Sequence, residues 1–170
     1  TVTGGTGTDS LITLSGGTVA ASQVESVTGT SGTDVLRMLG SGSASISAIE
    51  SVLGSTGTDS VAMLASGSLA TSIVETVIGG EGTDVITMLS GNAMRVSNVE
   101  TVKGSAGSDV VTLAGGGGLT VSQVETVLGT AASDDAVTMI AAGTLGASNI
   151  ESVTGTSAGT EVLRMLGAGG

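Results

Sequence analysis

An acidic residue recurs along this 170-residue chain at a nearly constant interval of 25 residues. A second acidic series keeps the same spacing, and a valine or isoleucine precedes each of its members. The two series are Asp9, Asp34, Asp59, Asp84, Asp109, Asp135 and Glu161, and Glu25, Glu50, Glu75, Glu100, Glu125 and Glu151. Self-similarity at a fixed period of this size is typical of architectures in which each repeat packs on the next.

Apolar residues keep the same register as the aspartates. A large aliphatic residue stands two positions after each acidic residue, methionine usually follows two positions later, and a mixed residue separates them. This alternation predicts a β-strand whose apolar side chains point inward. One repeat then contains a glycine loop, a strand, a Gly/Ser turn, a second strand and a short segment after the glutamate that is a candidate third strand. The two inward columns are Leu11, Leu36, Val61, Ile86, Val111, Val137 and Leu163, and Thr13, Met38, Met63, Met88, Leu113, Met139 and Met165.

These patterns predict an all-β fold, a right-handed parallel β-solenoid of about seven coils that spans residues 1–170 as a single repeat domain. We expect each coil to contain about 25 residues, and coils stacked at about 4.8 Å would make a rod roughly 30–35 Å long. Glycine and β-branched residues are too frequent for helices. The leucine-rich horseshoe has a similar repeat length and stays a minor alternative, because its asparagine-containing motif is absent.

The composition fits thin stacked coils better than an ordinary globular core. The chain has 30 glycines and no Phe, Tyr, Trp, Pro, Cys or His. We reject disorder because the apolar residues recur in register and the mean hydropathy is positive, +0.50. A net charge of −11 argues against binding to nucleic acid, which needs clustered basic residues. No apolar run is long enough for a transmembrane helix, so we expect no membrane insertion.

The loop before each aspartate contains closely spaced glycines. The segments 4–12 and 79–87 both match the pattern G-G-x-G-x-D-x-U-x, in which U is a large apolar residue. Glycines permit a positive φ, which lets backbone carbonyls turn toward a common point. The aspartate adds a carboxylate, and a hard cation such as calcium takes several oxygen ligands. The loops therefore indicate a candidate calcium site.

The two complete nonapeptides resemble the RTX family of secreted bacterial proteins, and the whole chain looks like the repeat regions of giant bacterial surface proteins and adhesins. The resemblance implies an extracellular location, secreted or on the cell surface, and a β-roll that binds calcium between loops stacked on one edge. Loops six and seven depart from the motif, so we expect no calcium there. The implied metal residues are Asp9, Asp34, Asp59, Asp84 and Asp109 with Gly7, Gly32, Gly57, Gly82 and Gly107.

Two explanations account for columns of stacked carboxylates, which repel one another. Either cations lie between the coils, or the carboxylates accept hydrogen bonds from loop N–H groups and threonine hydroxyls. Our hypothesis is calcium for the aspartate series and hydrogen bonding for the glutamate series, which no glycine loop accompanies.

No cluster of residues breaks the repeat symmetry, so we expect no enzymatic activity. The segment 35–40 recurs unchanged as 162–167, which indicates a super-repeat of five units. Exposed strand edges at both ends of such a solenoid predict axial continuation, either in a longer chain or by head-to-tail association of copies. We expect a structural protein, a rigid stalk or a filament-forming segment. The alternatives are a surface-layer or matrix protein, and a surface that binds ice or carbohydrate, with a threonine column of Thr8, Thr33, Thr58 and Thr83.

Overall fold

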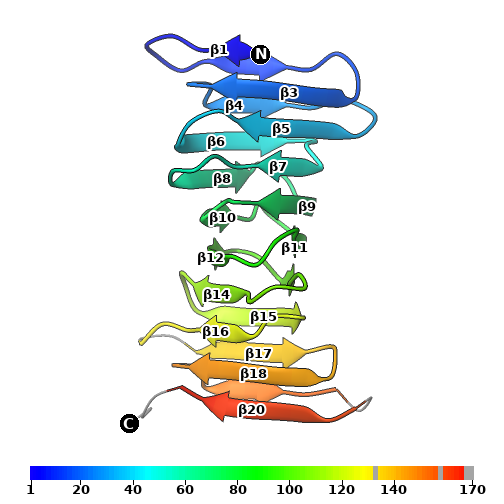
Figure 1. Ribbon diagram of the computed structural model, residues 1–170, viewed down its shortest axis with the longest axis vertical. Helices are drawn as coiled ribbons and strands as arrows, with labels where there is room; N and C mark the ends of the chain where they lie inside the picture. Colours follow the sequence, from blue (N-terminus) through cyan, green and yellow to red (C-terminus); the bar gives the residue numbers. More distant parts are fainter. Residues whose placement is uncertain (132–133, 157–158, 167–170) are drawn as a thin grey trace.

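The structure, a computed structural model, describes residues 1–131, 134–156 and 159–166. These residues form twenty strands and no helix, stacked along one long axis as a rod (Figure 1). Every pair of neighbouring strands is parallel, which confirms the predicted all-β solenoid. The strands are β1 (Val2–Thr3), β2 (Ser10–Ile12), β3 (Gly17–Ser22), β4 (Ser26–Thr28), β5 (Asp34–Met38), β6 (Gly42–Ser47), β7 (Ser51–Leu53), β8 (Asp59–Met63), β9 (Gly67–Ser72), β10 (Thr76–Ile78), β11 (Asp84–Met88), β12 (Ala93–Ser97), β13 (Thr101–Lys103), β14 (Val110–Leu113), β15 (Gly117–Ser122), β16 (Thr126–Leu128), β17 (Asp135–Met139), β18 (Gly143–Ser148), β19 (Ser152–Thr154) and β20 (Glu161–Met165).

Each turn of the solenoid contains two strands, one in each of two ten-stranded sheets. Odd-numbered strands form one sheet and even-numbered strands form the other. Residues that stack on each other are 16 to 20 positions apart, as in the pairs Val35–Ser51 and Thr126–Gly146. The expectation of seven coils of 25 residues is therefore wrong, because the chain makes about nine turns. At about 4.8 Å per turn the rod is roughly 43 Å long, longer than expected.

The coil length differs because the short segment after each glutamate is a full third strand. Each 25-residue repeat contributes an Asp strand such as β5, a long strand such as β6 and a short strand such as β7, so one repeat makes one and a half turns. Down each sheet the three kinds follow in a fixed order, as in β3, β5, β7 and β9. Because three is odd, each kind of strand changes sheet from one repeat to the next.

The core is one continuous layer of aliphatic side chains between the two sheets. The predicted inward columns are buried in the middle of the rod, with Leu36 1 % and Met88 2 % exposed. The short strands add a third column that sequence reasoning left open, in which Val52 and Val77 are fully buried. The short-strand valines Val27, Val52, Val77, Val102 and Val127 are all 0 % exposed.

A residue in the left-handed backbone conformation follows each long strand and brings the backbones of consecutive layers into close contact. It has a φ of 50–55° in all six described copies, although none of them is glycine. Its carbonyl lies directly over the first glycine of the preceding loop, so a Cβ on Gly54 would lie 1.6 Å from the carbonyl oxygen of Ile73. This contact explains why the first loop glycine occurs in every repeat whereas the second does not. The left-handed residues are Gln23, Ala48, Ile73, Asn98, Gln123 and Asn149.

Candidate functional site

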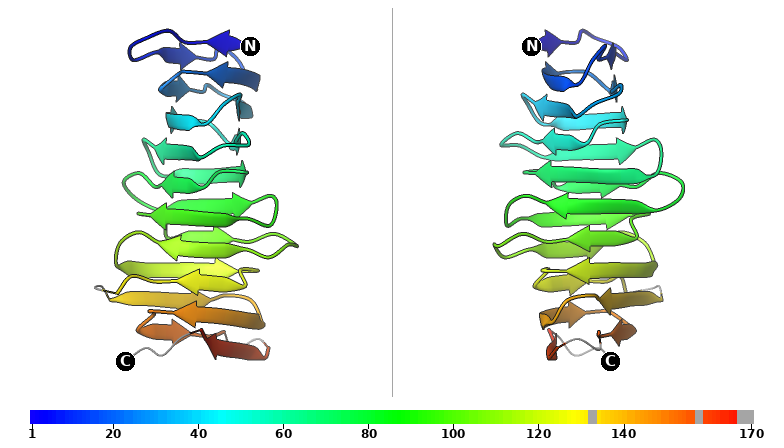
Figure 2. Two further views of the ribbon diagram at one scale, coloured as in Figure 1. Left: turned by 60° about the vertical axis from the view of Figure 1, so that its left-hand side comes forward. Right: turned by 90° about the vertical axis from the view of Figure 1, so that its right-hand side faces the viewer.

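The turns stack along two edges of the rod, which Figure 2 shows from two further sides. Consecutive aspartates lie on opposite edges, because one repeat makes one and a half turns: Asp59 begins β8 in the even-numbered sheet, and Asp84 begins β11 in the odd-numbered sheet. The expected stack of all five aspartates on one edge is therefore wrong. Asp34 and Asp84 share an edge, but three strand spacings, about 14 Å, separate them. The same alternation divides the expected threonine column of Thr8, Thr33, Thr58 and Thr83 between the two edges.

Each aspartate of the series except Asp84 closes its own loop with hydrogen bonds. In the loop before β14, Asp109 Oδ2 accepts the amide of Ser105 at 2.6 Å and its hydroxyl at 3.0 Å. The other oxygen, Oδ1, accepts the amide of Asn92 in the previous layer at 3.2 Å. Buried carboxylates need such donors because they have lost their water. The aspartates with 0 % exposure are Asp34, Asp59, Asp84, Asp109 and Asp135, whereas Asp9 near the end of the stack is half-buried.

The glutamates bind backbone amides, as the hydrogen-bonding hypothesis predicts. Glu50 Oε2 accepts the amide of Asp34 at 2.7 Å, and its own amide donates to the Asp34 carbonyl oxygen at 3.1 Å. The same arrangement recurs in six layers with side-chain bonds of 2.6–2.8 Å. Each glutamate therefore joins one layer to the next through hydrogen bonds of its side chain and its backbone amide.

The candidate loop glycines occur in two settings. Gly7, Gly32 and Gly82 have φ values of +133°, +118° and +105°, as a glycine-specific loop requires. Gly57 and Gly107 instead donate their amides to the hydroxyls of Ser55 and Ser105, at 3.2 and 3.1 Å. In these two loops, the hydroxyl of the serine at the second loop position therefore holds the later glycine by a hydrogen bond.

Calcium binding by these loops stays a prediction. Across residues 1–131, 134–156 and 159–166, no group of three His, Cys, Asp or Glu side chains could hold a metal ion. Two buried carboxylate oxygens in the same ranges lack a hydrogen-bond partner, Asp84 Oδ2 and Asp135 Oδ1. Asp84 belongs to one of the two loops with the complete nonapeptide. Parts of loops six and seven, residues 132–133 and 157–158, lie outside the described residues.

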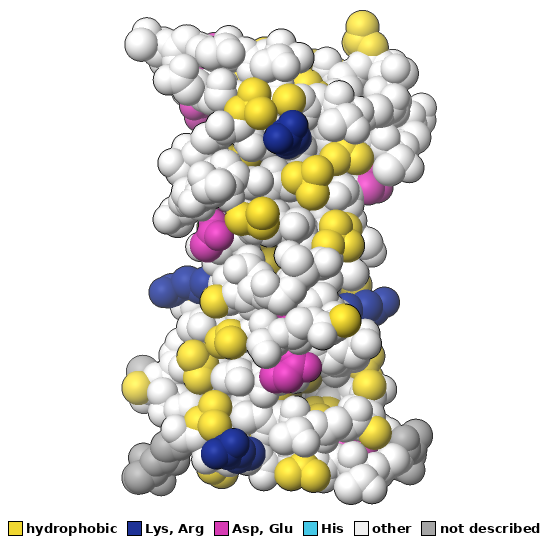
Figure 3. Space-filling view, in the orientation of Figure 1, with side chains coloured by type: hydrophobic (Ala, Val, Ile, Leu, Met, Phe, Trp, Pro, Cys, Tyr) yellow, Lys and Arg dark blue, Asp and Glu magenta, His cyan; other side chains and the backbone are white. Residues whose placement is uncertain are grey.

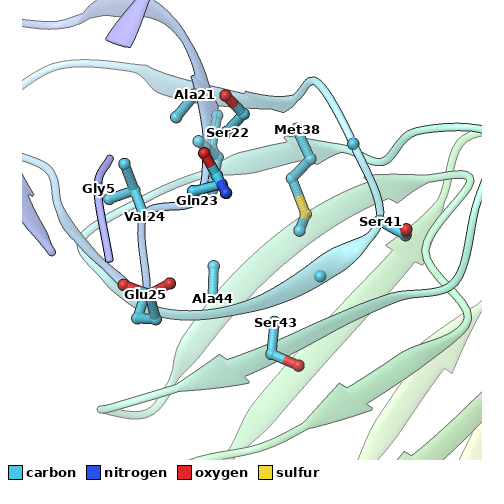
Figure 4. A pocket seen from close by; sticks show the side chains of 13 residues that line it. Gly5, Ala21, Ser22, Gln23, Val24, Glu25, Met38, Ser41, Ser43 and Ala44 are labelled. Atoms are coloured by element: carbon cyan, nitrogen blue, oxygen red, sulfur yellow. The ribbon is translucent and has the colours of Figure 1, made fainter. Parts of the chain in front are cut away.

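A recurring hollow, here called a notch, lies where the glutamate turn of one layer meets the Gly/Ser turn of the next. Glu25, Val24, Met38 and Gly42 line the first notch (Figure 4). Four such cavities have volumes of about 230, 150, 170 and 290 Å³. The other three are lined by Glu50, Met63 and Gly67, by Glu100, Leu113 and Gly117, and by Glu125, Met139 and Gly143.

Sequence reasoning missed the notches because the two turns that form each notch belong to different repeats. The Glu25 turn faces the turn before Gly42, and only the half-turn offset between repeats brings them together. At the equivalent place between Glu75 and β12, Asn92 replaces the glycine. Its amide Nδ2 donates to the Val74 carbonyl oxygen at 3.2 Å, so its side chain fills that notch.

No helix in the described part of the chain is long and apolar enough to cross a membrane. Comparison of the chain with known protein families, with curated protein sequences and with solved structures finds no match.

Proposed function

We propose that this chain is a structural, rod-forming segment of an extracellular bacterial surface or adhesin-type protein. The observation that supports this proposal best is the continuity of both sheets. Every strand from β3 to β18 pairs with a strand on each side, and no described layer interrupts the order of long, Asp and short strands. A rod of this kind transmits force along its axis through parallel backbone hydrogen bonds.

The repetition of the contacts also supports a mechanical role. The same aspartate and glutamate bonds recur in layer after layer, whereas an active site needs one singular constellation. The face in Figure 3 carries scattered apolar side chains and few charges, with no concentrated patch. Singly scattered apolar residues are normal on protein surfaces. These features favour a spacer over a binding head.

Rigidity is the property that tests the proposal. The chain lacks cysteine, so the pair Ser22→Cys and Ser122→Cys gives two specific spin-label positions, six layers apart in the odd-numbered sheet. Double electron–electron resonance should give one narrow distance distribution near 29 Å plus the label linkers. A broad distribution would reject the rigid rod even if circular dichroism showed intact β-structure. Immunogold labelling of native cells separately tests the extracellular location.

Axial association is the second part of the proposal. The inward-type residues of β20 are exposed, with Leu163 46 % and Met165 54 % exposed, whereas Leu36 at the equivalent position of β5 is 1 % exposed. A further layer on β20, from the same polypeptide or from a second copy, would cover these side chains. Light scattering on the 170-residue chain, with mass spectrometry of the native polypeptide, distinguishes the two sources. A stable monomer from a native chain no longer than 170 residues would contradict both.

The third part of the proposal is that calcium binds in the loop 79–84 above all. Asp84 Oδ2 is buried without a protein partner in the loop 79–84, whose glycine carbonyls would have to supply the further oxygen ligands. Calorimetry should then show a higher melting temperature with calcium than with a chelator. The Asp84→Asn variant should lose this difference. An equal melting temperature in both buffers would mean that hydrogen bonds alone hold all the loops.

A threonine ladder supports an ice-binding surface as the second candidate function. In the odd-numbered sheet, Thr101 pairs with Thr120, Thr120 with Thr138, and Thr138 with Thr154. Their hydroxyls recur at the strand spacing of about 4.8 Å on the outer face. Thermal hysteresis measurements test this function, with Thr120→Leu as the disrupting variant. No hysteresis in the parent chain would reject it.

A further inference from the structure

The five notch positions form an internal comparison, because four are open and one is filled by the chain itself. The residue that begins the long strand is glycine at Gly42, Gly67, Gly117 and Gly143, and it is Asn92 at the filled position. Asn92 donates from Nδ2 to the Val74 carbonyl oxygen. The group that fills this space is therefore a hydrogen-bond donor on a short side chain.

The open notches present acceptors around an apolar base. The residues that line the second notch include Glu50 with its carboxylate, Ser66 with its hydroxyl, and Ile49, whose place in the sequence repeat matches that of Val74 in the filled notch. Glu50 uses Oε2 for the Asp34 amide, and its Oε1 accepts no hydrogen bond from the described part of the chain. The apolar base includes Ile46 and Met63, which are 2 % and 8 % exposed.

We infer that each open notch binds a primary ammonium group carried on a short alkyl chain. The ammonium has three donors and no acceptor, and it meets a carboxylate and a carbonyl, while the alkyl chain covers the methionine or leucine. A bare metal ion fits less well, since calcium takes six to eight oxygens and the base of the notch is apolar. The net charge of −11 also favours a cation over an anion.

The experiment uses the ¹⁵N-labelled full chain and n-butylammonium chloride, with sodium chloride holding the ionic strength constant. We expect saturable amide shifts at the four open notches, for example at Ser66 and Gly67, and none at the notch that Asn92 fills. n-Butanol has the same alkyl chain without the charge. The affinity for n-butanol, measured from the same amide shifts, should be at least fivefold lower. Equal binding of n-butanol would overturn the role of the ammonium group.

Two reciprocal variants locate the binding. Gly67→Asn should fill the second notch and abolish its shifts while the other three remain, and a Cβ at Gly67 has only the Met63 Cε atom within 4 Å, at 3.9 Å. Asn92→Gly should open the fifth notch and add shifts at Ser90 and Gly91. Glu50→Gln keeps an acceptor for the Asp34 amide and should weaken binding at the second notch alone by fivefold or more.

The outcomes that contradict the inference are equally specific. Shifts spread evenly over the acidic surface would show a general counter-ion effect. Shifts at the second notch that survive in Gly67→Asn, or the absence of new shifts in Asn92→Gly, would place the binding elsewhere. If Gly67→Asn does not fold, the Asn92→Gly variant alone decides, because it only removes a side chain.

Discussion

The backbone amide of Asp59 donates a hydrogen bond of 2.8 Å to Glu75 Oε2, and the amide of Glu75 returns one of 3.1 Å to the Asp59 carbonyl oxygen. The two residues are 16 positions apart in the sequence and lie in adjacent layers on one edge. This two-way pair explains why the two acidic series keep the same period. The equivalent pairs are Asp9–Glu25, Asp34–Glu50, Asp84–Glu100, Asp109–Glu125 and Asp135–Glu151.

The first prediction removes the glutamate side of this pair. Glu75→Ala leaves the amide of the fully buried Asp59 without its acceptor, which should cost about 1–3 kcal/mol of unfolding free energy. Glu75→Gln keeps an acceptor oxygen and should cost less than half as much. Urea denaturation measures both variants. Glu81→Ala, an exposed acidic residue in a neighbouring loop, is the matched control and should be nearly neutral. Equal effects of the Ala and Gln variants would contradict the hydrogen-bond explanation.

The second prediction concerns the aspartate side. Asp59 accepts bonds from the amide and hydroxyl of Ser55 and from the amide of Gly42. Asp59→Asn turns an NH₂ group toward donors and should lower the unfolding free energy by about 2 kcal/mol or more. The loss should be the same with calcium and with a chelator, because protein donors already occupy both oxygens. A loss seen only in calcium would show that the metal, and not the loop amides, holds this carboxylate.

The third prediction tests the close approach of backbone at the first loop glycine. A methyl group at Gly54 would meet the Ile73 carbonyl oxygen at 1.6 Å, and this neighbour is backbone that cannot rotate away. Gly54→Ala should therefore cost about 4 kcal/mol or prevent folding. Gly40→Ala is the control, since a Cβ there meets nothing within 4 Å. A thermal unfolding curve for Gly54→Ala that overlays the Gly40→Ala curve would show that the layers are not locked at this contact.

The strands and the inward columns could be predicted from the sequence because they depend on local alternation. Leu36 and Met38 are buried because apolar residues at every second position of a strand point to the same face. The number of residues per turn could not be predicted in the same way. It depends on whether the segment after the glutamate turns a corner or pairs as a strand, and the short run Ser51–Leu53 satisfies either reading. The signal available in the sequence was the valine that recurs two positions after each glutamate, as at Val52 and Val77.

The errors about the site all follow from the wrong number of residues per turn. Once three strands per repeat are distributed over two strands per turn, Asp59 and Asp84 must lie on opposite edges, and a stacked ladder is geometrically excluded. The notches follow from the same offset, because Glu25 meets a turn of the next repeat. Only Asn92, where the other described repeats have glycine, marked this position in the sequence.

The last prediction is a substitution at a strained position that should raise the free energy of unfolding. Ala48 has a φ of +51°, a left-handed conformation that costs an alanine about 1 kcal/mol and that asparagine tolerates better. Asn98 and Asn149 already occupy the equivalent positions with φ values of +50° and +52°. Ala48 is exposed, so Ala48→Asn sacrifices little apolar burial and should raise the unfolding free energy by about 0.5–1 kcal/mol, seen by calorimetry as a melting temperature about 1–3 °C higher. Ala62→Asn places the same residue on the outer face of β8, where asparagine is unfavourable, and should lower the melting temperature. If both substitutions destabilise alike, the left-handed turn does not strain the alanine, and the six-fold recurrence of this conformation needs another explanation.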